Sequence, residues 1–303
     1  MAHRHRHQAL GTGRDRAANR RRLAWALALA AGFMAVEFAG GLLANSLALL
    51  ADAGHMLSDV AALGLSLFAL WMAARPSGPE RTYGHYRIEI LAALANGATL
   101  VALSIWIVAE AVARLHDPPE VAAPLMLAVA AAGLAVNLVA LAILRGGRDE
   151  SLNVRGAWLH VVSDALGSVQ VLLAGALIWG FGWNWADPAA SVLIALLIVY
   201  SAWWLLKDAV AVLMESAPGH IDVDQVRDAI LGVAGVGEVH DLHVWTITSG
   251  FEALSAHVVP EGGVETGTLP AAIRAELHDR FGIAHVTVQV ESEPCGPAGE
   301  TRC

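Results

Sequence analysis

The sequence contains one pattern of potential metal ligands twice, as "HMLSD" at residues 55–59 and "HVVSD" at residues 160–164. Each copy carries an imidazole and a carboxylate four residues apart. On an α-helix, residues i and i+4 share a face, with Cβ atoms about 5–6 Å apart. A helical conformation would therefore bring His55 beside Asp59 and His160 beside Asp164. Each copy can supply two ligands from one helix face.

Both copies lie inside strongly apolar runs, where an ionisable side chain at mid-membrane costs at least about 2.5–3.5 kcal/mol. One divalent cation offsets this cost, because two carboxylates cancel its charge and two neutral imidazoles complete four ligands. Such a set suits tetrahedral Zn²⁺ at about 2.0–2.2 Å. It lacks the sulfur that Cu⁺ prefers and has more nitrogen than Ca²⁺ or Mg²⁺ prefers. A single intramembrane His or Asp often only hydrogen-bonds between helices, but the repetition favours one shared Zn²⁺ site. Its predicted ligands are His55, Asp59, His160 and Asp164.

The composition of the chain is that of an integral membrane protein. Its 303 residues are 56% hydrophobic and 16% charged, and the mean hydropathy is +0.54, far from the usual soluble balance. The apolar excess lies in residues 24–213, whereas residues 214–303 have the composition of a soluble domain. The part up to residue 213 has 15 basic and 14 acidic residues, and the rest has 4 and 14. An acidic C-terminal part argues against nucleic acid as a partner and fits a domain that meets cations.

Six apolar windows are long enough to cross a bilayer, which takes roughly 20 residues of helix. They run over residues 23–43, 47–73, 88–113, 122–144, 154–181 and 186–206. Short breaks rich in Gly, Pro, Asn and Asp separate them, as is typical of turns. The predicted domains are a basic, His-containing tail (1–22), a six-span all-α transmembrane domain (23–213), a cytoplasmic domain (214–293) and a C-terminal tail (294–303).

The arginines predict the orientation of the spans. Seven Arg residues lie in the first 22 positions, and three more lie at each of the breaks after the second and fourth windows. The odd-numbered breaks contain only Arg114. By the positive-inside rule, both termini and the soluble domain are expected in the cytoplasm.

Residues 214–293 alternate between helical and strand periodicity. The stretches "DVDQVRDAILGV" and "TLPAAIRAELHDRFG" have helical spacing, and "VGEVHDLHVWTIT", "FEALSAHVVP" and "HVTVQVE" alternate as strands do. The order α-β-β-α-β predicts a small open sheet with helices on one face.

Several stretches also resemble a known family. They are "NSLALLADAGHMLSD", "YGHYRIEILAALANG", "HVVSDALGSV" and "HDLHVWTIT", which are similar to the cation diffusion facilitator family, specifically its bacterial zinc-exporting branch. The similarity extends over about residues 20–293. It implies that the four predicted ligands form a transport site, that the cytoplasmic domain is ferredoxin-like, and that a homodimer in the bacterial inner membrane exports Zn²⁺ by alternating access, driven by the proton gradient. Members with Asp at the position of His55 accept a wider set of metals, so His55 favours zinc, with Cd²⁺, Co²⁺ and Ni²⁺ as further candidates.

Exchange with protons also follows from the predicted ligands. Metal binding needs unprotonated ligands, so zinc and protons compete for the same atoms, and histidine exchanges a proton in the physiological range. The sequence has neither the G-x-x-x-x-G-K-[ST] motif of nucleotide binding nor the H-E-x-x-H motif of zinc hydrolases. We therefore expect a transporter without a nucleotide or organic cofactor and not an enzyme. A membrane metal sensor and an intramembrane zinc enzyme without net transport are the alternatives.

The resemblance implies a second metal site in the cytoplasmic domain. Family sites use positions that match His240, His257 and Glu291, in some members with a histidine such as His285. Gln289 stands where other members carry a further histidine, which argues against a full two-metal cluster. Surface histidines on an acidic domain are the alternative interpretation.

Other polar residues receive structural interpretations. Asp52 either lines an access route or faces the water-accessible end of its span. Glu37 is interpreted as a helix-to-helix hydrogen-bonding or cavity-lining group, and Glu89 as a side chain that reaches the membrane interface. The resemblance implies a pair between Arg87 and Glu215 that stabilises the dimer near the membrane surface.

The ends of the chain contain potential ligands without an assigned role. They are His3, His5, His7, Cys295 and Cys303. Two late cysteines are too few for a disulfide framework, which favours a reducing compartment for the soluble domain.

Overall fold

The computed structural model describes residues 13–73, 75, 78–80, 82–147, 152–262 and 266–292. The chain falls into two compact units. The first comprises Met1–Gly64 and Asn96–Trp203, and the second comprises Leu65–Ala95 and Trp204–Cys303. The division falls inside three long helices, so each unit combines segments that are distant in sequence. The predicted domain boundaries stay a prediction.

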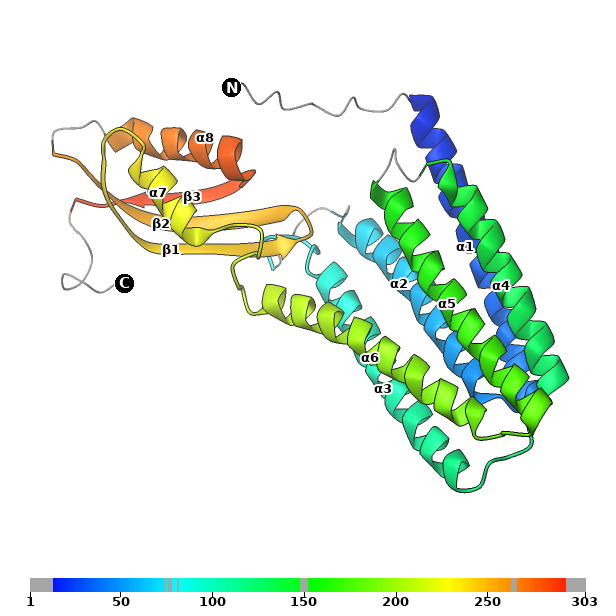
Figure 1. The fold of residues 1–303 in the computed structure, drawn as a ribbon. Coiled ribbons are helices and arrows are strands. Elements are labelled where there is room, and N and C mark those ends of the chain that lie inside the picture. The colour runs from blue at the N-terminus through cyan, green and yellow to red at the C-terminus, as the bar shows by residue number, and fades with distance from the viewer. Residues whose placement is uncertain are drawn as a thin grey trace, which may run out of the picture. The chain divides into compact units, whose positions relative to one another are not determined.

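Six long helices precede the sheet (Figure 1). They are α1 (Gly13–Ala44), α2 (Leu47–Ala73), α3 (Ile88–His116), α4 (Ala123–Arg145), α5 (Leu152–Phe181) and α6 (Ala186–Leu213). Each overlaps one of the predicted apolar windows. Helix α1 begins at Gly13, well before its window, because the arginines and alanines that precede the apolar run are themselves strong helix formers.

Among the described residues, five helices are long and apolar enough to cross a membrane, namely α1 from Arg21, α3, α4, α5 from Val154, and α6. The remaining long helix, α2, carries His55 and Asp59 in its first half, and several side chains of its second half lie outside those described. A helical region with several membrane-crossing helices is thus confirmed. The count of six spans stays a prediction.

An acid from a distant helix holds the start of α2. The first backbone N–H groups of a helix have no partner within that helix. Here the carboxylate of Asp187, in the first turn of α6, accepts hydrogen bonds from Leu47 N (2.8 Å), Ala48 N (3.2 Å) and Ser46 Oγ (2.6 Å). Asp187 is fully buried. It therefore fixes the beginning of α2 against the beginning of α6.

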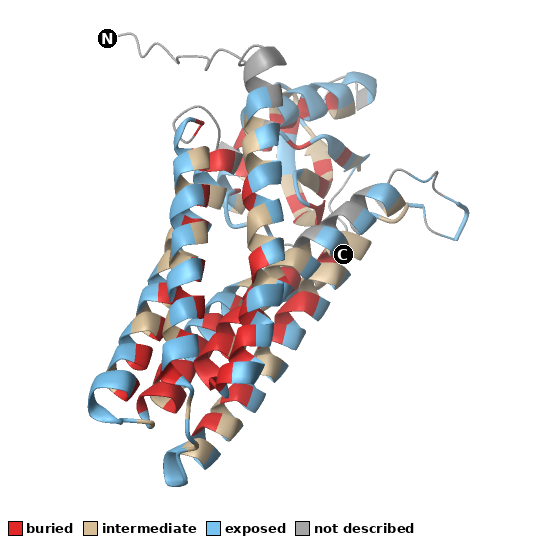
Figure 2. Cartoon of the chain, turned by 90° about the vertical axis from the view of Figure 1, so that its right-hand side faces the viewer, coloured by how far each residue is buried: buried red, intermediate tan, exposed pale blue. Residues whose placement is uncertain are grey.

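The apolar core of the first unit lies toward the end of the helices at which α2 and α6 begin (Figure 2). Its fully buried large side chains include Leu47, Leu49, Ile107, Met126 and Ile198. A smaller cluster lies where α1 and α5 begin and α4 ends, and consists of Ala26, Ala140, Leu144, Val154 and Val161. The helices are thus packed closely at one end and more sparsely at the other.

The second unit contains a three-stranded sheet. Its elements follow the order α7 (Val223–Leu231), β1 (Val236–Thr248), β2 (Phe251–Pro260), a 3₁₀ turn (Thr266–Thr268), α8 (Leu269–Phe281) and β3 (His285–Val290). Strand β1 pairs antiparallel with β2, and β2 pairs parallel with β3. The predicted small sheet is therefore confirmed.

Both short helices pack against this sheet, and local signals explain where they begin and end. The side chain of Asp222 accepts hydrogen bonds from Asp224 N and Gln225 N, which caps the start of α7. Helix α8 ends at Gly282, whose φ of 72° is left-handed and suits glycine. The buried core between helices and sheet includes Val226, Ile230, Val244, Leu254, Ile273 and Leu277.

Candidate metal centres

The two repeated motifs face each other in the first unit. Within α2, His55 Nε2 lies 3.7 Å from Asp59 Oδ2, and within α5, His160 Nε2 lies 3.7 Å from Asp164 Oδ2. Between the helices, His160 Nε2 lies 3.3 Å from Asp59 Oδ2. Two ligands of one tetrahedral Zn²⁺ at about 2.0–2.1 Å are separated by about 3.3 Å. The pairs within these four side chains, called the intramembrane quartet below, are therefore spaced nearly as two ligands of one ion are, although the quartet as a whole is more open than the ligand set of a bound ion.

Carboxylate atoms of the quartet are buried without a donor. Asp59 Oδ2 and Asp164 Oδ1 have no hydrogen-bond partner among the described residues. A buried carboxylate oxygen without a donor is costly, and a bound cation removes that cost. The two imidazole rings lie with centroids 6.1 Å apart, so the quartet is an open arrangement rather than a closed cage.

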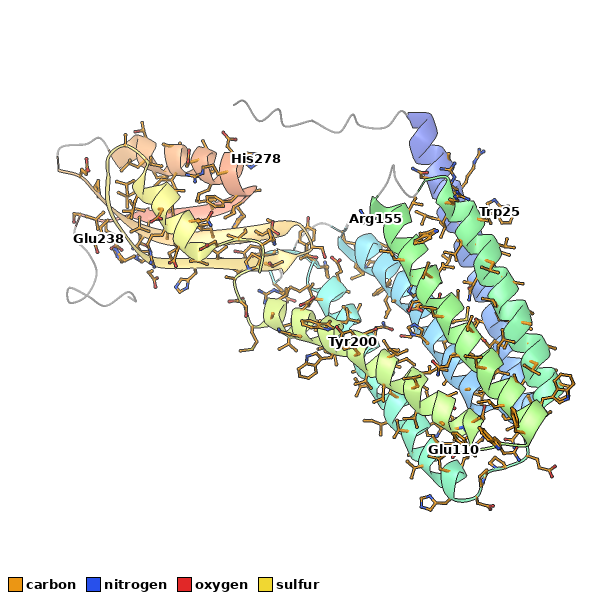
Figure 3. The ribbon with its side chains drawn as sticks, viewed as in Figure 1. Trp25, Glu110, Arg155, Tyr200, Glu238 and His278 are labelled. Carbon is orange, nitrogen blue, oxygen red and sulfur yellow. The ribbon has the colours of Figure 1, made fainter. Side chains whose placement is uncertain are left out.

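A cavity of about 490 Å³ opens beside the quartet. Asp59, His160 and Asp164 line it, together with residues from the early part of α1, the middle of α2, the end of α4 and the early part of α5. The segments of α1, α4 and α5 lie toward the end where Trp25 of α1 and Arg155 of α5 are found (Figure 3). Arg155 belongs to the arginine groups that predict the cytoplasmic side. The cavity thus connects the quartet with the predicted cytoplasmic end of the helices.

Buried polar groups fill the opposite side of the quartet. Ser168, one turn beyond Asp164, donates to the Asp164 carbonyl oxygen at 3.2 Å and accepts from Asn137 Nδ2 at 3.3 Å. Glu37 and Asp52 are 1% and 6% exposed. Asn137 of α4 thus hydrogen-bonds to Ser168 of α5, from one helix to another.

A second cluster lies on the sheet of the second unit. His240 Nε2 lies 3.1 Å from Glu291 Oε2, and His257 Nδ1 lies 3.0 Å from Glu291 Oε1. His240 and His257 are directly paired across β1 and β2, and Glu291 N donates to Val258 O just beyond β3. His240, His257 and Glu291 are called the cytoplasmic triad below. Among the residues that the structure describes, they are the only group of three whose ligand atoms all lie within 4.8 Å of one another.

Gln289 supports the triad instead of extending it. Its Nε2 donates to Glu291 Oε1 at 2.6 Å. Desolvation acts to raise the pKa of Glu291, but the hydrogen bond from Gln289 and the neighbouring His257 and His240 outweigh it, and the pKa lies below its usual value. Glu291 is therefore held as a carboxylate, the form that binds metal.

The structure does not bring His285 to the triad. His285 begins β3, whereas Glu291 follows its end, and the six residue steps from one to the other span roughly 20 Å at 3.3 Å per step. The ring of His285 lies edge-on to Tyr83 and Phe251, with centroids 5.6 Å and 6.1 Å away. Within one chain His285 is thus part of an aromatic cluster.

Glu215 and Glu89 each make a contact in the second unit, and the sequence predicts only the contact of Glu215. Arg87 donates to Glu215 at 2.7 Å, as the family resemblance leads one to expect. Glu89 was interpreted as a residue that reaches the membrane interface. Instead its carboxylate accepts hydrogen bonds from Thr248 and Ser249 in the β1–β2 turn. No local signal in the sequence indicates this long-range contact. The predictions for His3, His5, His7, Cys295 and Cys303 lie outside the described residues.

Two family profiles cover nearly the whole chain. Residues 23–214 match the cation efflux transmembrane domain, and residues 218–293 match the cytoplasmic domain of cation efflux proteins. A metal-bound C-terminal domain of the CzcD transporter from Cupriavidus metallidurans, of known structure, is 39% identical. The match covers 23% of this chain and 99% of that one, with a TM-score of 0.23.

Full-length relatives are similar over almost their entire length. The chain is 45% identical over 297 residues to a cadmium, cobalt and zinc/H(+)-K(+) antiporter of Bacillus velezensis, which covers 96% of this chain and 92% of that protein. It is 45% identical to the metal cation efflux system protein CzcD of Cupriavidus metallidurans, over 92% and 89% of the two chains. It is 42% identical to the zinc transporter ZitB of Escherichia coli, over 98% and 95%.

Proposed function

We propose that this chain, which belongs to the cation efflux family, is a zinc/proton antiporter that exports Zn²⁺ from the cytoplasm through the intramembrane quartet. Family membership makes it a multi-pass membrane protein that transports metal cations and not an enzyme. The observation that carries the finer proposal is the Asp59 carboxylate, which faces His55 on its own helix and His160 on α5.

The proposed topology has six spans with both termini in the cytoplasm. Helix α2 is taken as a span because it carries half of the quartet and, with 27 residues, exceeds the roughly 20 residues a bilayer requires. The arginine distribution supports the orientation. The cytoplasmic domain, proposed for residues 214–293, has the α-β-β-α-β order of a ferredoxin-like fold.

The quartet supports zinc as the principal cargo. Its two imidazoles and two carboxylates complete the four ligands that Zn²⁺ prefers. Two relatives are named for cadmium, cobalt and zinc, and those ions accept similar nitrogen and oxygen ligands. We therefore propose that Cd²⁺, Co²⁺ and Ni²⁺ follow zinc in preference.

Proton exchange is proposed to follow from ligand competition. In the orientation that faces the cytoplasm, the cavity beside the quartet admits Zn²⁺, which displaces protons from the histidines. In the opposite orientation, protons that enter from outside occupy the same atoms and release the ion. Alternating access would move α2 and α5 with their ligands against the remaining helices.

The cytoplasmic triad is proposed as a regulatory metal site of a homodimer. It joins three strand segments through two histidines and one carboxylate, so a bound ion would stiffen the sheet edge. The profile that matches residues 218–293 is named as a dimer domain, which supports a homodimer.

The test of this function is zinc flux in proteoliposomes with an imposed pH gradient, followed with a zinc dye and a pH dye. Asp59→Asn keeps the side-chain shape but removes the charge. Loss of a residue that only supports a metal ligand typically lowers metal affinity or activity about 10–100-fold. We expect Asp59→Asn, which removes a ligand itself, to lower coupled flux by more than this. Asp117→Asn, an exposed acid after α3, is the matched control. Zinc binding without flux in the unaltered protein would indicate a sensor and contradict the proposal.

A further inference from the structure

Strand β1 contains a bulge next to the cytoplasmic triad. His240 pairs with His257, but His243 pairs with Ser255, so three steps along β1 match two steps along β2. The extra residue is Asp241, whose φ of 46° is left-handed. In a regular strand, residues three apart point to opposite faces of the sheet. The bulge therefore turns His243 onto the face that carries His240 and His257.

The carboxylate of Asp241 lies between two imidazoles. Its Oδ1 is 3.0 Å from His243 Nε2, and its Oδ2 is 3.8 Å from His257 Nε2. The two distances lie on either side of the about 3.3 Å that separates two ligands of one tetrahedral ion, and they start from different oxygens of Asp241, so the three residues form a more open group than the triad. His257 faces the triad through Nδ1 and Asp241 through Nε2, so its ring lies between two groups of potential ligands.

His243, beside Asp241, is open to solvent, whereas His240, in the triad, is not. The side chain of His243 is 56% exposed, whereas that of His240 is 6% exposed. His243 also lines a cavity of about 670 Å³, which Glu80 and Glu215 line as well. Arg87, which pairs with Glu215, lines the cavity as well. A divalent cation that approaches through this cavity meets His243 before it meets His240.

We propose that Asp241, His243 and the Nε2 atom of His257 form an outer metal position that captures a divalent cation such as Zn²⁺ or Co²⁺ and passes it to the cytoplasmic triad. This rests on the part of the proposed function that gives the triad a metal. A neutral imidazole accepts a metal through one nitrogen at a time. His257 therefore serves the outer position or the triad in turn, and the ion moves inward as His240 and Glu291 replace Asp241 and His243.

The two contacts of Asp241 differ in length. Its Oδ1 is within hydrogen-bond range of His243 Nε2, at 3.0 Å, but the 3.8 Å from its Oδ2 to His257 Nε2 is beyond that range. A carboxylate that only orients a metal-bound histidine accepts a hydrogen bond from its second nitrogen, so Asp241 does not orient His257 in this way. The left-handed backbone at this position suits Asp as well as Asn or Gly, and the charge of Asp beside two imidazoles suits a divalent cation.

The test uses full-length protein in detergent and Co²⁺, whose visible absorption reports bound metal. The parent variant is His240→Ala with Glu291→Ala, which dismantles the triad but keeps His257. Asp241→Asn is then added, because Asn tolerates the left-handed backbone and removes the charge. We expect the parent to bind one Co²⁺ per chain in this domain. Adding Asp241→Asn or His243→Ala to the parent should abolish this binding.

Matched changes control for general effects. Asp224→Asn alters an exposed acid of α7, and His278→Ala alters an exposed histidine of α8 (Figure 3). Neither change should alter the amount of Co²⁺ that the parent binds. Cobalt bound at other sites is common to the parent and its variants, so it does not affect the difference between them. Thermal unfolding checks that each variant is folded, and His243→Ala preserves the test if Asp241→Asn does not fold.

Two results would overturn the outer position. One is equal Co²⁺ binding by the parent and by both added variants. The other is an effect of Asp241→Asn only when the triad is intact, which would make Asp241 a positioning residue for His257. Neither result depends on zinc flux, so failure of this inference is distinguishable from failure of the export function.

Discussion

Asp59 Oδ2 lies 3.3 Å from His160 Nε2, so a carboxylate of α2 and an imidazole of α5 approach within the spacing of two ligands on one ion. Each residue also has its helical neighbour four positions away, and these neighbours complete the quartet. A shared ion would therefore tie α2 to α5 directly. Any movement of these two helices would carry the ion with them.

His55 is expected to set metal preference. We predict that His55→Asp raises the ratio of cadmium to zinc transport several-fold, because a carboxylate can bind through one or two oxygens and so accommodates the larger Cd²⁺ better than the single nitrogen of an imidazole does. Proteoliposome uptake with each metal at matched concentrations measures the ratio. An unchanged ratio would remove His55 from the selectivity of the site.

Zinc binding at the quartet should weaken in acid. Protonated histidine cannot bind metal, so each proton that zinc must displace costs up to about tenfold in apparent affinity per pH unit. With two histidines, the loss should approach about a hundredfold per unit. Calorimetry across pH 5–8, on protein whose triad is removed by His240→Ala and Glu291→Ala, measures the slope. A flat profile would mean that the histidines are not ligands.

Asp187 should matter for stability more than for metal binding. Asp187→Ala leaves the Leu47 and Ala48 N–H groups and the Ser46 hydroxyl without their buried acceptor. An unsatisfied buried donor costs about 1–3 kcal/mol, so thermal unfolding in detergent should occur at a clearly lower temperature. Asp187→Asn keeps one acceptor oxygen and should lose less.

The matched comparison for Asp187 is Asp117→Ala, at an exposed position after α3. If Asp187→Ala unfolds at the same temperature as Asp117→Ala, the capping contact at the start of α2 has no energetic role. Zinc affinity of the folded Asp187→Ala protein should stay close to that of the unaltered chain.

The cytoplasmic triad should depend on Glu291 and not on His285. Glu291→Gln retains the side-chain shape but removes the charge that faces both histidines. We expect at least about tenfold weaker zinc binding, within the range seen when the partners of a metal site are changed. Equilibrium dialysis measures zinc binding to the triad alone when it is carried out on protein whose quartet no longer binds zinc because of Asp59→Asn and Asp164→Asn. Equal weakening by His285→Ala would show that His285 contributes to it, against the geometry of a single chain.

The pairing of ligands within each half of the quartet could be predicted because its information is local. His55 and Asp59, like His160 and Asp164, share a helix face by spacing alone, and burial cost then requires a common partner. The helices were predictable for the same reason, since length and apolarity decide a membrane-crossing helix. The α-β-β-α-β order followed from the two periodicities of helices and strands.

Long-range geometry was not predictable. The sequence shows only that Asp187 is an acid near the start of α6. Nothing nearby in the sequence indicates that it caps α2. Asp241 lies in a stretch that alternates like a strand, yet its bulge depends on the register with β2. His285 has the right residue type for a ligand, but strand length carries it to the opposite end from Glu291.

The central claim is that one metal ion is held jointly by α2 and α5. Anomalous diffraction at the zinc absorption edge, on crystals grown with Zn²⁺, tests it most directly. We predict a peak within about 2.0–2.2 Å of His55, Asp59, His160 and Asp164, which disappears in Asp59→Asn crystals. A peak bound by ligands of only one of the two helices, or no peak between them while zinc transport persists, would contradict it.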